Sequence, residues 1–166
     1  MSNVQRLQRH VRFFDLNDDG KVTVAETFKG LRSLKLDLLI SSIGAIALPL
    51  ALGKKSGGTL FSISIDGLQK VAHPPDDTGT FSQPEAITLS QPFYTLADIK
   101  ELIKKRGGNP NTFMFLIEWT LLFQTLKKFR SYKTPEGVDA ITKEEMEGLM
   151  DGSLFFKLTG RKVPDY

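Results

Sequence analysis

The segment from Asp15 to Glu26, DLNDDGKVTVAE, constrains the fold of this chain most, because its residue types match a calcium-binding loop at each ligand position. Gly20 occupies the sixth position, where the chain turns sharply and a residue without Cβ adopts a positive φ most easily. Amphipathic helical sequence lies on both sides, so the segment predicts a helix–loop–helix calcium site. The alternative is an acidic glycine turn that binds nothing. The expected ligands, with Lys21 acting through its backbone carbonyl, are Asp15, Asn17, Asp19, Lys21, Thr23 and Glu26.

The composition is that of an ordinary globular chain. With 166 residues, 40% of them hydrophobic and 25% charged, the chain is long enough for one domain with a buried core. The net charge is +3 despite the acidic loop, so basic residues collect elsewhere, as solvated faces or as contacts for anionic lipid head groups. No nucleic acid is expected as a partner, because no zinc pattern or recognised RNA-binding motif accompanies the charge.

Cysteine is absent, which excludes disulfides, iron–sulfur clusters, thiol catalysis and a thiolate-ligated haem. The chain has two histidines, His10 and His73, so any imidazole chemistry must run through them. The N-terminus has no apolar stretch followed by a small-residue cleavage site, so secretion by a signal peptide is not expected.

Apolar residues at helical spacing predict an entering helix over residues 3–14 and an exiting helix from Val24 to Leu34. His10 lies on the apolar side of the entering helix. Taken alone, this position favours a core histidine held by a backbone partner over a metal ligand.

The run from Leu38 to Leu52, LLISSIGAIALPLAL, contains no charge. As a helix it would measure about 22 Å, against about 30 Å for the hydrocarbon core of a bilayer. Pro49 is expected to break this helix before its end. Two interpretations stay open: a buried core helix, or a segment that dips into one lipid leaflet with Lys54 and Lys55 at the interface.

The remaining elements are weaker in the sequence. A short strand is expected within Leu60–Ile65, irregular chain over 81–95, a helix from Thr95 to the Gly107-Gly108 pair, and a strongly apolar helix over 112–129. The last helix contains Glu118, for which an exposed acid is slightly favoured over a buried partner of a cation or a histidine. His73 precedes two prolines, which restrict the loop that carries it.

Residues Thr134–Glu145 can be aligned with the calcium loop as a second, degenerate EF-hand. Thr134, Val138 and Asp139 stand at the first, fifth and sixth positions, so no ion is expected there. Ile141 is expected to pair with Val22. The sequence therefore predicts a mainly α single domain with short β pairing between the two loops. Its parts are an EF-hand over 3–34, the apolar segment 38–52, a central histidine loop and helix over 53–110, and C-terminal helices with the degenerate EF-hand over 112–158.

Several stretches together resemble the caleosin family over nearly the whole chain. They are LQRHVRFFD at 7–15, ETFKGLR at 26–32, the histidine loop at 65–79, Glu118-Trp119, and DGSLF at 151–155. The resemblance implies a calcium-binding haem protein of lipid droplets or the cytosolic face of the endoplasmic reticulum, with peroxygenase activity. In that family two histidines are implicated in haem binding, and the matching positions are His10 and His73.

The implied reaction transfers one oxygen atom from a lipid hydroperoxide to an unsaturated fatty acid, with haem b and Ca²⁺ as cofactors. Because the iron must keep one axial position open, one histidine is expected as the proximal ligand, and the other as a weak distal ligand or proton shuttle. A helix holds His10 more rigidly than a loop holds His73, which favours His10 as proximal. Calcium would then order the helix that carries His10.

The apolar run departs from typical caleosins, which carry several closely spaced prolines where this chain has Pro49. The short N-terminal arm resembles fungal or algal members. A peripheral or partly soluble protein is therefore expected, as a monomer or an oligomer. The competing hypotheses are a non-enzymatic calcium-dependent protein of lipid surfaces and a soluble calcium sensor.

Overall fold

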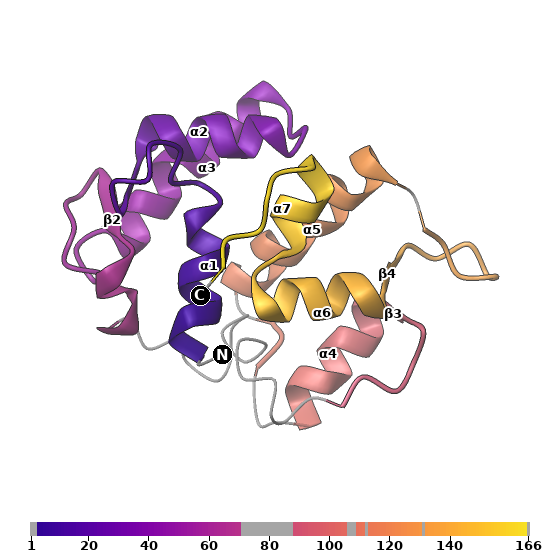
Figure 1. Ribbon diagram of the computed structural model, residues 1–166. Helices are drawn as coiled ribbons and strands as arrows, with labels where there is room; N and C mark the ends of the chain where they lie inside the picture. Colours follow the sequence, from indigo (N-terminus) through magenta and orange to yellow (C-terminus); the bar gives the residue numbers. More distant parts are fainter. Residues whose placement is uncertain (1–2, 71–87, 106–108, 112, 131, 166) are drawn as a thin grey trace. The chain divides into compact units, whose positions relative to one another are not determined.

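The computed structural model describes residues 3–70, 88–105, 109–111, 113–130 and 132–165 (Figure 1). The chain forms two compact units: unit 1 comprises Met1–Ala72 and Asp151–Tyr166, and unit 2 comprises His73–Met150. The described residues are mainly helical with two small antiparallel β pairs, which confirms the expected class. Whether the units unfold together as the single domain expected over 1–166 stays a prediction.

Unit 1 begins with the two helices that the sequence predicts around the acidic loop. Its elements are α1 (Asn3–Arg12), β1 (Lys21–Thr23), α2 (Val24–Ser33), α3 (Leu38–Leu52), β2 (Ser62–Ser64), the 3₁₀ helix η1 (Asp66–Lys70) and, after unit 2, α7 (Leu154–Thr159). Thr23 caps α2 because its hydroxyl accepts from the backbone N–H of Glu26. The buried core of unit 1 is Val11, Phe13, Phe14, Val22, Leu31, Leu34, Leu36, Ile63, Ile65, Leu68 and Phe156.

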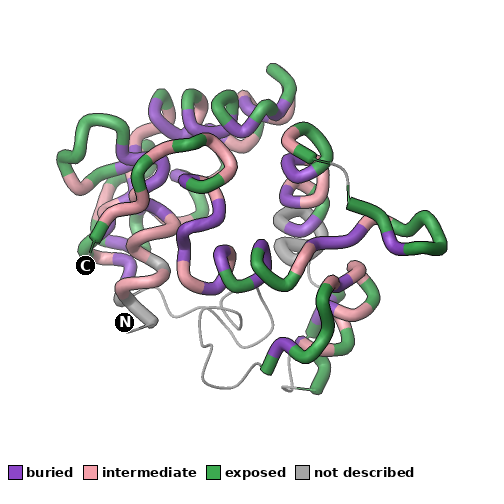
Figure 2. The backbone as a smooth tube through the Cα atoms, turned by 45° about the vertical axis from the view of Figure 1, so that its right-hand side comes forward, coloured by how far each residue is buried: buried purple, intermediate pink, exposed green. Residues whose placement is uncertain are grey.

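Unit 2 contains β3 (Phe93–Thr95), α4 (Leu96–Lys105), α5 (Phe113–Phe129), β4 (Ala140–Thr142) and α6 (Lys143–Asp151), whose last residue belongs to unit 1. Helices α4 and α5 confirm the two helices expected in this region. Figure 2 shows buried and exposed positions following one another along the helices, as amphipathic patterning requires. Residues 71–87, including His73, and the side chain of Glu118 lie outside the described residues, so their expected roles stay predictions.

The expected pairing of Val22 with Ile141 is wrong. Val22 lies opposite Ile63 in the β1–β2 pair, and Ile141 lies opposite Tyr94 in the β3–β4 pair. Each loop strand therefore pairs with a strand nearer in sequence, which closes a shorter stretch of chain at lower entropic cost. Strand β3 also falls inside the segment 81–95 that the sequence predicts to be irregular. Its sequence, Phe-Tyr-Thr, consists of good strand formers, and their number is too small for a clear pattern.

Helix α3 is continuous through Pro49, so the expected break at that residue is wrong. The helix starts at Asp37, whose carboxylate accepts from the N–H of Ile40 at 2.9 Å. Its buried stripe, Ser41, Ala45 and Pro49, consists of small residues, and α3 packs against α2. This packing compensates for the one hydrogen bond that Pro49 removes. Among the described residues, no helix has the length and apolarity needed to cross a membrane.

Candidate functional site

The acidic loop is folded around the carboxylate of Asp15. This carboxylate accepts from the backbone N–H groups of Gly20 at 2.9 Å and Asp19 at 3.2 Å. Gly20 has φ +78, in the left-handed region, which confirms why the sequence places a glycine at the sixth position. The turn thereby directs the first six residues of the loop around one point.

Glu26 closes the loop from its other end. One oxygen, Oε1, accepts from the N–H of Leu16 at 3.3 Å, and the other, Oε2, accepts from the N–H of Thr23 at 2.9 Å. The Thr23 hydroxyl also donates to Oε2 at 2.7 Å. The twelfth position is thus tied both to the start of the loop and to the strand that precedes α2.

The loop concentrates negative charge that is partly removed from water. Asp15 and Glu26 are buried, with 7% and 8% of their surfaces exposed. Burial raises the pKa of Asp15 above its ordinary value, and the charges of Asp19 and Glu26 raise it further, while the backbone N–H groups of Gly20 and Asp19 oppose the rise. A bound cation would relieve the repulsion that makes the ionised form costly.

The donor set suits Ca²⁺, which prefers oxygen ligands. In the described part of the chain, no three acidic or imidazole side chains form a ready metal cluster. Both oxygens of Glu26 accept hydrogen bonds from the loop and its capping residue. Glu26 must turn away from Thr23 to bind an ion, and the six predicted calcium ligands stay a prediction.

His10 lies in the last turn of α1, directly before the loop. Its half-buried ring lies against Phe155 of α7, with 4.8 Å between the ring centroids and 46° between the planes. Phe155 in turn contacts Phe13 at 5.5 Å and Phe14 at 6.2 Å. The imidazole is therefore held at the edge of an aromatic cluster that α1 and α7 build together.

The segment Asp151–Phe156, here called the C-terminal segment, packs closely on the backbone of α1. Gly152 has φ +80, and a Cβ on it would lie 2.6 Å from the carbonyl oxygen of Arg6 and 2.8 Å from the backbone nitrogen of His10. Only glycine fits both this conformation and this distance. The Arg9 guanidinium donates to the carbonyl of Asp151 at 3.5 Å.

Arg161, which follows α7, contacts the same aromatic cluster. Its guanidinium donates to the carbonyl oxygen of Phe13 at 2.6 Å and lies 4.7 Å from the centroid of the Phe13 ring. It also lies 5.3 Å from the centroid of the Phe156 ring. Partial burial lowers the pKa of Arg161 below its usual range, because removal from water disfavours the charged form.

These residues fit a haem ligand environment in their chemistry. Histidine is a common haem ligand, and cysteine, which would supply a thiolate ligand, is absent from the chain. The hydroxyl of Ser153, next to Gly152, is buried and has no hydrogen-bond partner among the described residues. The assignment of His10 and His73 as haem ligands and catalytic residues stays a prediction.

The sequence did not predict the contact between the C-terminal segment and α1. The DGSLF stretch matches a family pattern, but that match does not say which helix the segment packs against. Neither the conformation of a glycine nor a tertiary contact leaves a periodic pattern in the local sequence. The helix start expected at Thr95, by contrast, is confirmed. The Thr95 N–H and hydroxyl donate to Asp98 at 2.7 and 2.6 Å, the same arrangement that joins Thr23 to Glu26.

A family model described as "Caleosin related protein" matches residues 2–159. The chain belongs to the caleosin family. A protein from Lilium longiflorum named "Peroxygenase" is 29% identical to this caleosin over 180 residues, covering 94% of this chain and 70% of the lily protein. "Probable peroxygenase 4" from Arabidopsis thaliana is 26% identical over 174 residues, covering 92% of this chain and 84% of the Arabidopsis protein. No solved structure matches this caleosin.

Proposed function

We propose that this caleosin is a calcium-binding, haem-dependent peroxygenase. It transfers one oxygen atom from a lipid hydroperoxide to an unsaturated fatty acid, and the hydroperoxide leaves as the corresponding alcohol. The observation that carries the proposal is the family match over residues 2–159, joined by two relatives whose names say peroxygenase. A haem bound to the chain would supply the iron that cleaves the O–O bond.

His10 is the proposed proximal ligand. Its helix, its aromatic neighbour Phe155 and the close packing of Gly152 support this role, because each restricts the direction of the imidazole. His73 is the proposed proton-transfer residue, whose imidazole would move a proton between the two oxygens of the hydroperoxide. The substrate's fatty-acid chain requires apolar surroundings next to the haem.

Calcium is the proposed structural cofactor, bound by Asp15, Asn17, Asp19, Lys21, Thr23 and Glu26. The loop begins three residues after α1 ends, and the N–H of Asp15 donates to the carbonyl of Arg12 at 3.2 Å. A calcium ion that neutralises the loop carboxylates would stabilise the folded loop, which is joined directly to the end of α1. Calcium therefore acts on His10 through the helix and not through direct contact.

The test combines haem binding with the source of the transferred oxygen. We expect the purified chain to take up haem with a Soret band and to place ¹⁸O from a labelled fatty-acid hydroperoxide into a second, unsaturated fatty acid. His10→Ala should abolish the band, whereas His73→Ala should keep a band and lose oxygen transfer. A wild-type chain that stays colourless with haem, or that produces unlabelled product, contradicts the proposal.

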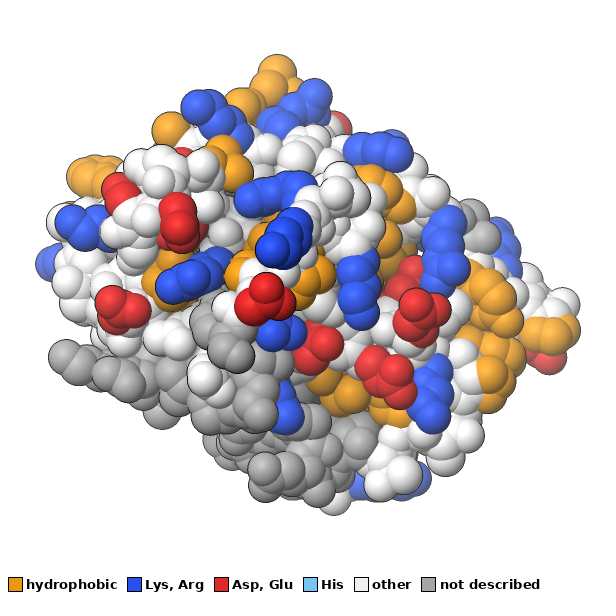
Figure 3. All heavy atoms as spheres, in the orientation of Figure 1, with side chains coloured by type: hydrophobic (Ala, Val, Ile, Leu, Met, Phe, Trp, Pro, Cys, Tyr) orange, Lys and Arg blue, Asp and Glu red, His pale blue; other side chains and the backbone are white. Residues whose placement is uncertain are grey.

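A lipid surface is the proposed location, on a droplet or the endoplasmic reticulum, and it is also the basis of the second candidate function, a non-enzymatic lipid-surface protein. The exposed side of α3 carries large apolar residues with 48% to 70% of their surfaces exposed, namely Leu38, Leu39, Ile43, Ile46 and Leu50. Lys35, Lys54 and Lys55 flank the helix and are exposed. Figure 3 shows hydrophobic and basic side chains next to one another at the top of the view, where Figure 1 places α2 and α3. An apolar helix face bordered by lysines suits an anionic interface.

Charge on the exposed side of α3 tests the lipid proposal separately from the enzyme proposal. We expect Leu39→Asp with Ile43→Asp to reduce flotation with phosphatidylserine-containing vesicles strongly while haem binding persists. Val138→Asp is the matched control, because Val138 is also exposed, at 51%, and lies in unit 2. Unchanged flotation of the double variant contradicts the lipid proposal. Flotation without oxygen transfer in the wild type supports the non-enzymatic function.

A further inference from the structure

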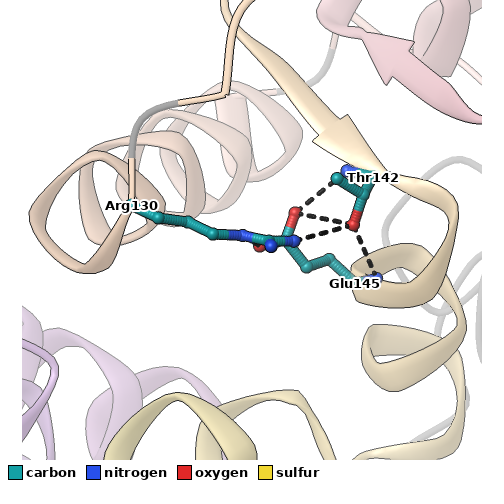
Figure 4. Close-up of polar contacts among 3 residues, drawn as sticks. All are labelled: Arg130, Thr142 and Glu145. Carbon is teal, nitrogen blue, oxygen red and sulfur yellow. Dashed lines mark hydrogen bonds and ion pairs between the residues drawn. The ribbon is translucent and has the colours of Figure 1, made fainter.

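The closing residue of the degenerate loop, Glu145, is hydrogen-bonded on both of its carboxylate oxygens. Oε2 accepts from the N–H of Thr142 at 2.9 Å and from its hydroxyl at 3.1 Å. Oε1 accepts from Nε of Arg130 at 2.8 Å (Figure 4). Arg130 follows the end of α5, so the cation comes from the helix that enters the loop.

The same guanidinium also contacts the ninth loop position. Its Nη2 donates to the hydroxyl of Thr142 at 3.0 Å. Arg130 therefore bridges Glu145 and Thr142, the two positions that supply ligands at the end of a calcium loop. The side chain of Glu145 is 8% exposed, and a carboxylate so far removed from water requires a paired charge. The hydrogen bond to Glu145 raises the pKa of Arg130, so the cation is permanent.

The acidic loop of unit 1 provides the matched comparison. The bond from the N–H of Thr23 to Glu26 is 2.9 Å long, as is the bond from the N–H of Thr142 to Glu145. The remaining oxygen of Glu26 accepts from a backbone N–H and not from a guanidinium. Fifteen residues before Glu26, at the place equivalent to Arg130, stands the buried, apolar Val11.

We infer that Thr134–Glu145 is a second cation site, filled from within the chain by the guanidinium of Arg130 in the place that calcium takes in related loops. The site takes a planar guanidinium and no calcium. The contact between β4 and the start of α6 is therefore kept at any calcium concentration. The calcium response of the protein then arises from Asp15–Glu26 alone. That last statement rests on the proposed function, whereas the role of Arg130 does not.

Amide hydrogen exchange in the full chain, followed by NMR, measures both loop ends in one molecule through the N–H groups of Thr142 and Thr23. We expect Arg130→Gln to speed exchange at Thr142 about five- to tenfold, the loss of one charge-assisted hydrogen bond from a half-exposed cation, and to leave Thr23 unchanged. Calcium should slow exchange at Gly20, whose N–H donates to the Asp15 carboxylate that the ion would fix, and leave Thr142 unchanged. Lys127→Gln, which removes the exposed ion pair with Asp139, is the control and should affect neither amide.

Chemical rescue identifies the ligand class. In Arg130→Ala, methylguanidinium chloride at tens of millimolar should restore slow exchange at Thr142, and tetramethylammonium chloride at the same concentration should not. In a Glu145→Gln background the effect of Arg130→Gln should largely disappear.

Three results overturn the inference: unchanged exchange at Thr142 in Arg130→Gln, equal acceleration at Thr23 and Thr142, or protection of Thr142 by calcium. A failure of calcium to protect Gly20, with the Arg130 results as expected, overturns the proposed calcium site and leaves the guanidinium site standing.

Discussion

The two twelve-residue loops end in the same way and begin differently. In both, a threonine at the ninth position and a glutamate at the twelfth form a reciprocal cap on the following helix. At the first position, the Asp15 carboxylate accepts from two backbone N–H groups of its loop, whereas Thr134 offers a neutral hydroxyl that accepts from the N–H of Val138 at 3.3 Å. Joining strand to helix therefore does not depend on an ion. The two loops differ in the oxygen donors of their first halves, so the full donor set predicted for calcium is present in Asp15–Glu26 and incomplete in Thr134–Glu145.

The backbones of the two loops also differ where the sequence differs. Both turn through the left-handed region at the fourth position, at Asp18 with φ 57 and Gly137 with φ 82. The calcium-type loop turns again at Gly20, while the equivalent Asp139 of the other loop has no positive φ. Asp139 instead pairs with Lys127 at 2.6 Å. In place of a second left-handed turn, the degenerate loop has two ion pairs, Lys127–Asp139 and Arg130–Glu145.

The largest expected effect separates the two glutamates. Glu26→Gln should weaken calcium binding about a thousandfold, because affinity in these loops follows the number of charged ligands. Glutamine is compatible with the same cap, so the fold should be kept. Glu145→Gln should leave calcium affinity unchanged. Isothermal titration with calcium checks both variants, and equal effects would remove the distinction between the loops.

Much of this comparison could be predicted from the sequence, for identifiable reasons. The acidic loop was predictable because each ligand position is fixed by local spacing, and Gly20 marks a backbone conformation that one residue type favours. The strand partners were not, because three-residue strands such as β2 and β3 carry too few residues to encode a partner. The Arg130–Glu145 pair was also missed, since nothing in a charge pattern tells a solvated arginine from one that contacts a buried acid.

The next effect concerns the two glycines that differ in their surroundings. Gly152→Ala should lower the free energy of unfolding by about 3 kcal/mol, the sum of left-handed strain and overpacking against α1. Gly137→Ala should cost about 1–2 kcal/mol, because its φ is +82 and nothing lies within 4 Å of the added Cβ. Urea unfolding measures both.

Haem affinity gives these two variants a second measurement. It should fall in Gly152→Ala, whose added methyl group displaces the helix of His10, and stay unchanged in Gly137→Ala. Equal haem affinity in the two variants would show that the C-terminal segment does not position His10.

A smaller effect follows from the raised pKa of Asp15. Because the folded, calcium-free protein holds this proton more tightly than the unfolded chain, stability falls as pH rises from the ordinary value of 3.8 through the raised pKa. With saturating calcium the ionised form is bound, so the slope should reverse. Asp15→Asn should make both slopes shallower, which thermal unfolding across the acid pH range with and without a chelator would test. A slope of the same sign in both conditions would show that Asp15 does not bind calcium.

The smallest effect is expected from the outer ion pair of unit 2. Lys127 and Asp139 are 50% and 34% exposed at their side chains, so water screens their attraction and rotamer entropy offsets it. Lys127→Gln should change the free energy of unfolding by about 0.5 kcal/mol or less. Arg130→Gln should cost more, because its partner Glu145 is buried and loses its counter-charge. Urea unfolding of the two single variants separates these cases. If Lys127→Gln costs more than Arg130→Gln, the ion pair that stabilises the degenerate loop is the one at the sixth position, Asp139, and not the one at the twelfth, Glu145.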